Sequence, residues 1–159
     1  MEVSPWIVAA DAEGLLAFLA EVFGAEEAGR VPGPDGGIGH AETRLGASTV
    51  VVMDAHDGWT PHPSLLRVAV DDVAGVVRRA EAAGARVVTP RTSLPFGDDV
   101  ARVADPWGNL WWVHQHVEDV GFDELLRRMD DPASSETMAG FELSLDAEMR
   151  RRTGGTEQP

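Results

Sequence analysis

The side chains best suited to acid–base or metal chemistry gather in two short stretches. NLWWVHQH carries His114 and His116 two positions apart, and GHAETRLG carries His40 and Glu42 with the same spacing. Alternate residues of a strand share one face, so each pair would project the same way. Imidazole and carboxylate groups can move protons or bind zinc and iron. The two stretches therefore suggest a catalytic pair, a metal site or a ligand-binding wall.

Composition excludes several kinds of chemistry. The chain has 159 residues and no cysteine, so disulfides, thiolate–zinc sites and thiol catalysis are excluded. It has no lysine either, which excludes Schiff-base catalysis through lysine. A net charge of −14 opposes nucleic-acid binding, which depends on clustered cations. A cationic small molecule would suit this charge better.

Nothing in the sequence points to a membrane. The apolar runs are far shorter than the ~20 residues that a membrane span needs. The first residues, MEVSPWIVAADAE, lack the basic start and long apolar core of a secretion signal. We therefore expect a cytoplasmic protein that binds neither membranes nor nucleic acid.

Two segments repeat one pattern 60 residues apart. PWIVAADAEGLLAFLAEVFGA and LLRVAVDDVAGVVRRAEAAGA each read as an apolar strand, an aspartate, an amphipathic run and a glycine. Asp11 and Asp71 are expected to cap the two helices, and Gly24 and Gly84 to end them in the left-handed conformation. Three strand-like stretches, separated by turns rich in glycine and proline, follow each helix. The repeat predicts two tandem βαβββ modules.

The modules are placed at residues 1–57 and 58–119, within one structural domain, and residues 120–159 break the repeat. Two apolar sets in this extension have helical spacing. The first set, which predicts a short amphipathic helix, comprises Phe122, Leu125, Leu126 and Met129. The second, which predicts a helix beginning after Ser134–Ser135, comprises Met138, Phe141, Leu145 and Met149. Arg150 to Arg152 and Gly154-Gly155 suit a helix end, and the tail TGGTEQP is expected to fray.

The duplicated modules, the DPWGN turn before the last strand and GHAETRLG followed by STVVVMD resemble the vicinal oxygen chelate superfamily. That superfamily includes glyoxalase I, extradiol dioxygenases and bleomycin-resistance proteins, and the last motif is similar to its PhnB-like branch. The resemblance covers roughly residues 3–117. It implies an α+β fold whose modules form a curved, cup-like mixed sheet, to which the C-terminal helices are added. It also implies a homodimer.

The resemblance implies four metal-ligand positions, on the first and last strands of each module, which are typically His and Glu. Here they fall near Ser4–Pro5, at Val52, near Ser64–Leu65 and at Trp112. None of these residues is a metal ligand, so we expect no metal cofactor at the family's position. An alternative set, able to bind zinc, iron or manganese, consists of His40, Glu42, His114 and His116.

Strand alternation predicts which side chains line the cup. Trp112 occupies a position that faces the cup in the family, and the offset of 60 gives Val52 the equivalent position in the first module. The tryptophan would stack on a planar or cationic group, and polar side chains would orient the ligand. The predicted wall consists of His40, Glu42, Arg44, Val52, Asp54, Leu65, Arg67, Arg102, Trp112 and His114.

We therefore expect a small-molecule-binding protein of the glyoxalase/bleomycin-resistance type, which needs no metal and sequesters an antibiotic or another aromatic or cationic compound. The alternative is an enzyme of the same superfamily, a lyase, isomerase or dioxygenase. It would use either the shifted metal set or metal-free acid–base catalysis by His40 and Glu42. A third alternative is a structural partner protein that acts through its C-terminal helices.

Overall fold

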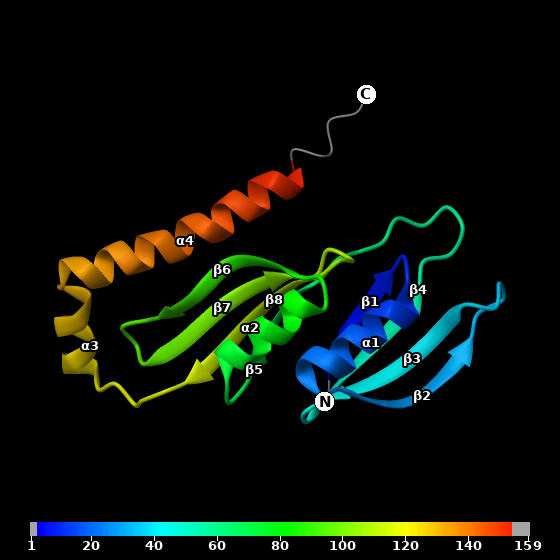
Figure 1. Ribbon diagram of the computed structural model, residues 1–159, viewed down its shortest axis with the longest axis horizontal. Coiled ribbons are helices and arrows are strands. Elements are labelled where there is room, and N and C mark those ends of the chain that lie inside the picture. Colours follow the sequence, from blue (N-terminus) through cyan, green and yellow to red (C-terminus); the bar gives the residue numbers. More distant parts are fainter. Residues whose placement is uncertain (1–2, 154–159) are drawn as a thin grey trace.

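The computed structural model describes residues 3–153, which form two similar modules and a helical extension (Figure 1). The first module contains one helix, α1 (Ala12–Phe23), and a four-stranded mixed sheet in the order β1-β4-β3-β2. Its first strand is parallel to its last, and the other pairs are antiparallel. The strands are β1 (Trp6–Ala9), β2 (Glu26–Pro32), β3 (Ile38–Leu45) and β4 (Ser48–Asp54).

The second module repeats this topology with helix α2 (Val73–Ala82) and the strand order β5-β8-β7-β6. Here too the first and last strands are parallel and the other pairs antiparallel. The strands are β5 (Leu65–Ala69), β6 (Arg86–Ser93), β7 (Asp98–Ala104) and β8 (Leu110–His116). The predicted α+β fold of two tandem modules is confirmed.

The helix caps explain where α1 and α2 begin and end. The backbone N–H of Gly14 donates to the Asp11 side chain, and Gly24 ends α1 with a φ of 69°. In the second module the cap is Asp72, which accepts from the Gly75 N–H, so the prediction of Asp71 was wrong by one residue. The sequence offered two adjacent aspartates, and the offset of 60 selected the wrong one.

The sequence offset between equivalent residues of the two modules is not the same throughout. This difference decides which side chains share a face. Val51 lies opposite Glu42, and Trp112 lies opposite Arg102. Arg102 is therefore 60 positions after its counterpart Glu42, whereas Trp112 is 61 positions after its counterpart Val51. Four residues separate the paired Arg44 and Thr49 in the first module, whereas five separate the equivalent pair, Ala104 and Leu110, in the second. Because a one-residue slip moves a strand's side chains to the other face, the uniform offset fails in the last strand.

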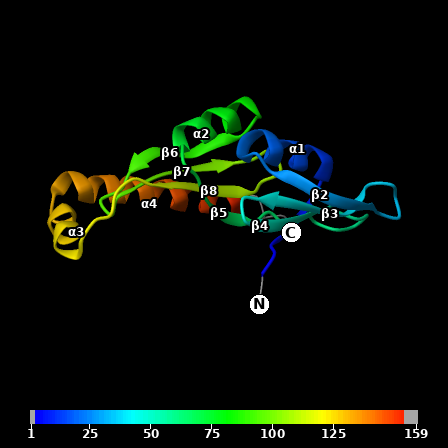
Figure 2. The ribbon, with the colours of Figure 1, turned by 90° about the horizontal axis from the view of Figure 1, so that it is seen from below.

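The hydrophobic core lies between the two helices and one face of both sheets, which we call the helix face. Figure 2 shows α1 and α2 on this side of the sheets and the C-terminal helix on the other. The core joins both modules through residues such as Leu15, Leu19, Val73, Val76 and Trp111, all buried. Each fully buried side chain of this size contributes ~1.5–3 kcal/mol, so the two modules stabilise each other. The opposite face of each sheet is called the cup face below.

Two helices follow the second module. The short helix α3 (Phe122–Met129) agrees with its prediction, and α4 (Pro132–Thr153) begins before Ser134–Ser135, earlier than predicted. Proline is favoured in the first turn of a helix, because its missing N–H would have no partner there. α4 runs along β6, at the edge of the second module's sheet, on the cup-face side (Figures 1 and 2). The predicted Gly154-Gly155 stop and all but the first residue of the predicted frayed tail lie outside the described residues.

Candidate ligand-binding site

The turn DPWGN fixes the orientation of β8, which carries the central side chain of the site. Asp105 is buried and accepts hydrogen bonds from the backbone N–H groups of Trp107 and Asn109, the Asn109 amide and the Trp111 indole. Burial raises the pKa of Asp105, and these hydrogen bonds act in the opposite direction. Holding Trp111 in the core forces its neighbour Trp112 onto the cup face.

Arg102 lies beside Trp112 on that face and is 1% exposed. Its guanidinium carbon is 4.3 Å from the centre of the Trp112 ring and 3.6 Å from that of Phe141 in α4. One terminal nitrogen, Nη1, donates to the Thr89 hydroxyl at 3.0 Å and to the Phe141 carbonyl at 2.7 Å. Burial lowers the pKa of Arg102 to about 10, which leaves it charged at neutral pH. The site thus contains a buried cation held by aromatic rings and neutral acceptors.

A cavity of 530 Å³ lies between α4 and the cup face of the second module. Arg102 lines it from the sheet, and Glu142 and Asp146 line it from the helix. Its apolar lining consists of Phe96, Trp112, Met138, Phe141, Leu145 and Met149. Ligand sites in proteins typically combine this size with a largely apolar lining and a few polar groups. These features make the cavity a candidate small-molecule pocket.

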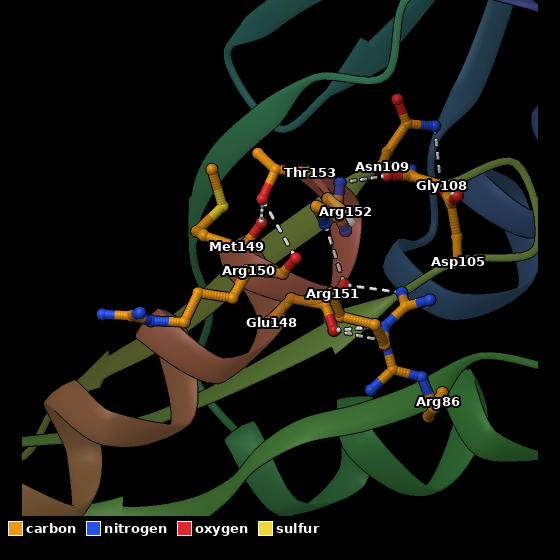
Figure 3. A network of polar contacts seen from close by, with 10 residues as sticks. All are labelled: Arg86, Asp105, Gly108, Asn109, Glu148, Met149, Arg150, Arg151, Arg152 and Thr153. Atoms are coloured by element: carbon orange, nitrogen blue, oxygen red, sulfur yellow. Dashed lines mark hydrogen bonds and ion pairs between the residues drawn. The ribbon is translucent and has the colours of Figure 1, made fainter. Parts of the chain in front are cut away.

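A buried ionic network attaches the end of α4 to the second module (Figure 3). The Glu148 side chain is 2% exposed and accepts hydrogen bonds from Arg86 on β6 and from Arg151 and Arg152 on α4. Arg152 also donates to the Gly108 carbonyl in the DPWGN turn at 2.7 Å. Burial alone would raise the pKa of Glu148, but Arg151, Arg86 and Arg152 outweigh it and lower the pKa to about 2. The network holds the helix over the cavity.

The cup face of the first module has no such cover among the described residues. His40, Glu42 and Arg44 project from β3 on this face, and Glu42 is more than half exposed. The His40 ring lies 3.3 Å from a Glu42 oxygen and packs edge-on against Trp6, with ring centres 5.3 Å apart. The pair could exchange a proton with a bound molecule, but it sits on an open surface. Arg44 is paired with Glu26 at 3.7 Å.

Val52 and Asp54 face the wrong way for the predicted cup. Val52 is fully buried in the core against the helix face. Asp54 accepts from the backbone N–H groups of Ala12 at 2.7 Å and Ile38 at 2.6 Å, so it supports the start of α1. The expectation that both line the cup was wrong, because the equivalent of Trp112 is Val51 and not Val52. Val51 is no metal ligand either.

The remaining predicted wall residues lie at the margin of the cavity rather than in its lining. Leu65 and Arg67 share the cup face with Trp112 through the pairing of β5 with β8, but both are more than half exposed. His114 follows Trp112 on that face, and its ring approaches the Val68 carbonyl at 3.4 Å. His116 is held by Asp98 and Asp119, and its hydrogen bonds to them raise its pKa.

The alternative metal set is not assembled. His40 and Glu42 belong to the sheet of the first module, whereas His114 and His116 belong to that of the second. Within residues 3–153, no three His, Asp or Glu side chains are grouped so that they could hold a metal ion. The four residues therefore remain two separate pairs.

Sequence reasoning missed the residues that α4 contributes to the site. Met138, Phe141, Leu145 and Met149 were recognised as the apolar stripe of a helix, and all four line the cavity. Their spacing carried no information on which surface they would cover. The burial of Glu148 could not be inferred from the sequence either, since a glutamate near three arginines is typical of an exposed helix end.

The model of the glyoxalase/bleomycin resistance protein/dioxygenase superfamily matches residues 3–113. The chain belongs to this superfamily. The match ends before α3 and α4, so the helix that forms one wall of the cavity lies outside the part of the chain that the family model describes. The predicted family is therefore confirmed for both modules.

Among similar proteins, the uncharacterized protein Rv0887c of Mycobacterium tuberculosis is 37% identical over 138 residues, covering 80% of this chain and 81% of its own. The crystal structure of TioX from Micromonospora sp. ML1 has a TM-score of 0.62 and 28% identity, and covers 74% of this chain and 99% of its own. The PhnB protein from Bacillus cereus shares the fold, with a TM-score of 0.57, 19% identity, and coverage of 72% and 99%. In residues 3–153, no helix is long and apolar enough to cross a membrane.

Proposed function

We propose that this protein binds a small molecule in the cavity between α4 and the cup face of the second module. One observation carries the proposal: a 530 Å³ cavity whose lining is mainly apolar contains a tryptophan ring and a buried arginine. Such a combination is what a small, partly polar ligand requires. Trp112 supplies a flat surface for stacking, and α4 supplies the opposite wall.

Membership of the superfamily supports this proposal, since its name includes bleomycin resistance proteins. On this account the protein acts by sequestration and needs no metal, and the ligand is an antibiotic or a compound of similar size. The predicted family ligand positions hold side chains that do not bind metals. Stoichiometric zinc, iron or manganese in untagged protein, lost in a His114→Ala variant, would contradict this part of the proposal.

The experiment that tests the site is a thermal-shift screen of a small-molecule library with two matched variants. Leu145 lines the cavity, whereas Leu143, two residues away on the same helix, is 65% exposed. Leu145→Trp should fill the cavity and abolish every stabilising hit, and Leu143→Trp should keep them. Hits that survive Leu145→Trp unchanged would place the site elsewhere.

A second candidate is metal-free acid–base catalysis, which the contact between His40 and Glu42 favours. A ligand that spans both cup faces would bring its reactive atom to this pair. The test is turnover of any compound found by the screen, in the wild type and in His40→Ala. Binding without turnover, unchanged in His40→Ala, would reject catalysis by this pair.

We also propose that the protein is a homodimer. The described residues of α3 have no buried side chain, and the helix exposes Phe122, Leu126 and Met129 to solvent. Large apolar side chains gathered on one helix are typical of a subunit contact. Sedimentation velocity should give twice the mass of the 17.0 kDa chain, and Phe122→Asp should lower it toward the monomer. A monomeric wild type would reject the proposal.

A further inference from the structure

The charge of Arg102 is not balanced by any carboxylate that the structure describes. The ion pairs of the described residues leave Arg102 out, and burial is the cause of its lowered pKa. A buried cation without a counter-ion is costly, and a protein usually pairs it or neutralises it. A guanidinium cannot be neutralised at physiological pH. An anion from outside the chain would balance the charge of Arg102.

Two buried N–H groups next to the cavity also lack an acceptor. Among residues 3–153, neither the Nε of Arg102 nor the indole Nε1 of Trp112 has a hydrogen-bond partner. Both side chains line the cavity, and they are neighbours across β7 and β8. Most buried polar groups in proteins are hydrogen-bonded, so two unsatisfied donors at one cavity indicate a missing acceptor. An oxyanion would accept hydrogen bonds from both donors and balance the charge of Arg102.

We propose that the ligand of this cavity is a flat aromatic molecule with an anionic oxygen group, such as a carboxylate or sulfonate. The anionic group contacts Arg102 and the Trp112 indole N–H, and the aromatic body lies along the apolar wall of α4. This inference rests on the proposed function, and it replaces an aromatic or cationic ligand with an aromatic anion. The specificity resides in Arg102, whose counterpart in the first module is Glu42.

The overall negative charge of the protein opposes anion binding in general, so it cannot explain a preference for an anion in this cavity. Glu142 and Asp146 also line the cavity, but both are exposed and their charges are screened by water and salt. Arg102 is shielded from water, so its interaction with an anion is much less screened. At a net charge of −14, non-specific binding would favour neutral or cationic molecules over anions. A preference for an anion would therefore point to Arg102.

Two fluorescent probes of nearly the same shape test the inference. 1-Anilinonaphthalene-8-sulfonate carries a sulfonate, and N-phenyl-1-naphthylamine is the same molecule without it. The wild type should bind the sulfonate roughly tenfold more tightly than the neutral probe, which is the expected contribution of one charge-assisted contact. In Arg102→Met this preference should vanish, through weaker binding of the sulfonate alone. Arg67→Met, which removes an exposed arginine from the same face, should keep it.

The outcomes separate this inference from the proposed function. If the neutral probe binds as tightly as the sulfonate and Leu145→Trp abolishes both, the cavity is a site but the inference of an anion is wrong. If Leu145→Trp affects neither probe, the proposed site itself is wrong. Should Arg102→Met fail to fold, Trp112→Phe takes its place in the test. It keeps an aromatic ring at this position and removes the indole N–H donor. This variant must then weaken binding of the sulfonate probe severalfold relative to binding of the neutral probe. Equal losses of affinity for the two probes would overturn the inference.

Discussion

Glu42 and Arg102 occupy equivalent positions in the two modules, but one lies in an exposed environment and the other in a buried one. Glu42 lies on an open cup face, half-exposed and next to His40, whereas Arg102 is buried between Trp112 and Phe141. The strands that carry them have the same topology and pairing. The difference arises from α4, which covers one module and leaves the other open. The comparison shows that a C-terminal extension can cover one half of a duplicated fold and leave the other half open.

The covering helix is held by few contacts. Phe141 and Glu148 are the buried residues of the described part of α4, and neighbouring side chains such as Leu143 remain exposed. A helix anchored at two points can be moved without unfolding the modules, since the main core lies on the other side of the sheets. The following substitutions test this difference between the covered and the open module.

The largest effect is expected for Asp105→Ala in the turn of the covered module. Four donors, including the Trp111 indole, would lose their acceptor in a buried environment. We expect a loss of ~3 kcal/mol in the free energy of unfolding, measured by urea denaturation. Asp35→Ala is the control in the open module, because Asp35 accepts one exposed hydrogen bond from Gly37. A loss below about 1 kcal/mol in Asp105→Ala would contradict the role of the turn.

Phe141→Ala should have the next largest effect, about 2–3 kcal/mol. The substitution removes a ring that is 6% exposed and opens Arg102 to water. Part of the loss is offset because the arginine regains its hydration. The control is Leu143→Ala on the exposed side of α4, which should change the unfolding free energy by less than about 0.5 kcal/mol. Equal effects of the two variants would show that α4 is not packed on the sheet.

Acidification should detach α4 before it affects the open module. The pKa of Glu148 is lowered from 4.5 to about 2 by its three arginines, so its contribution is complete above pH 4.5 and is lost as the pH falls toward 2. Hydrogen exchange should show protection of residues 141–153 decreasing in this window while the first module stays protected. Glu148→Gln should remove this protection at neutral pH, and exposed Glu142→Gln should not. Simultaneous loss in both modules would contradict a separately anchored helix.

The smallest effect is expected in the open module. His40→Ala removes a half-exposed ring whose contacts are the Trp6 edge and one Glu42 oxygen. We expect a change in unfolding free energy below about 0.5 kcal/mol and unchanged probe binding. Fluorescence titration with the sulfonate probe measures the second quantity. A severalfold loss of affinity would show that the two cup faces form one site.

The sequence predicted the family, both modules and the two added helices, because these rest on local patterns that repeat. The prediction failed where a shift of one residue decides which face of a strand a side chain occupies, as at Val52 and Asp54. It also chose the wrong one of two adjacent aspartates, Asp71 and Asp72, as the cap of α2. Periodicity identified the apolar stripe of α4 but gave no information on its partner surface. The burial of Arg102 could not be predicted for the same reason, since it depends on a helix about 40 positions later in the chain.

We propose that the binding site is the covered cup face and not the open one. The indole N–H signals of the five tryptophans allow a direct test by NMR, with Trp6 reporting on the open face and Trp112 on the covered one. Substitution of each tryptophan by phenylalanine assigns the signals. Titration with 1-anilinonaphthalene-8-sulfonate should shift the Trp112 signal to saturation and leave that of Trp6 in place. A saturating shift of Trp6 with Trp112 unmoved would contradict the account.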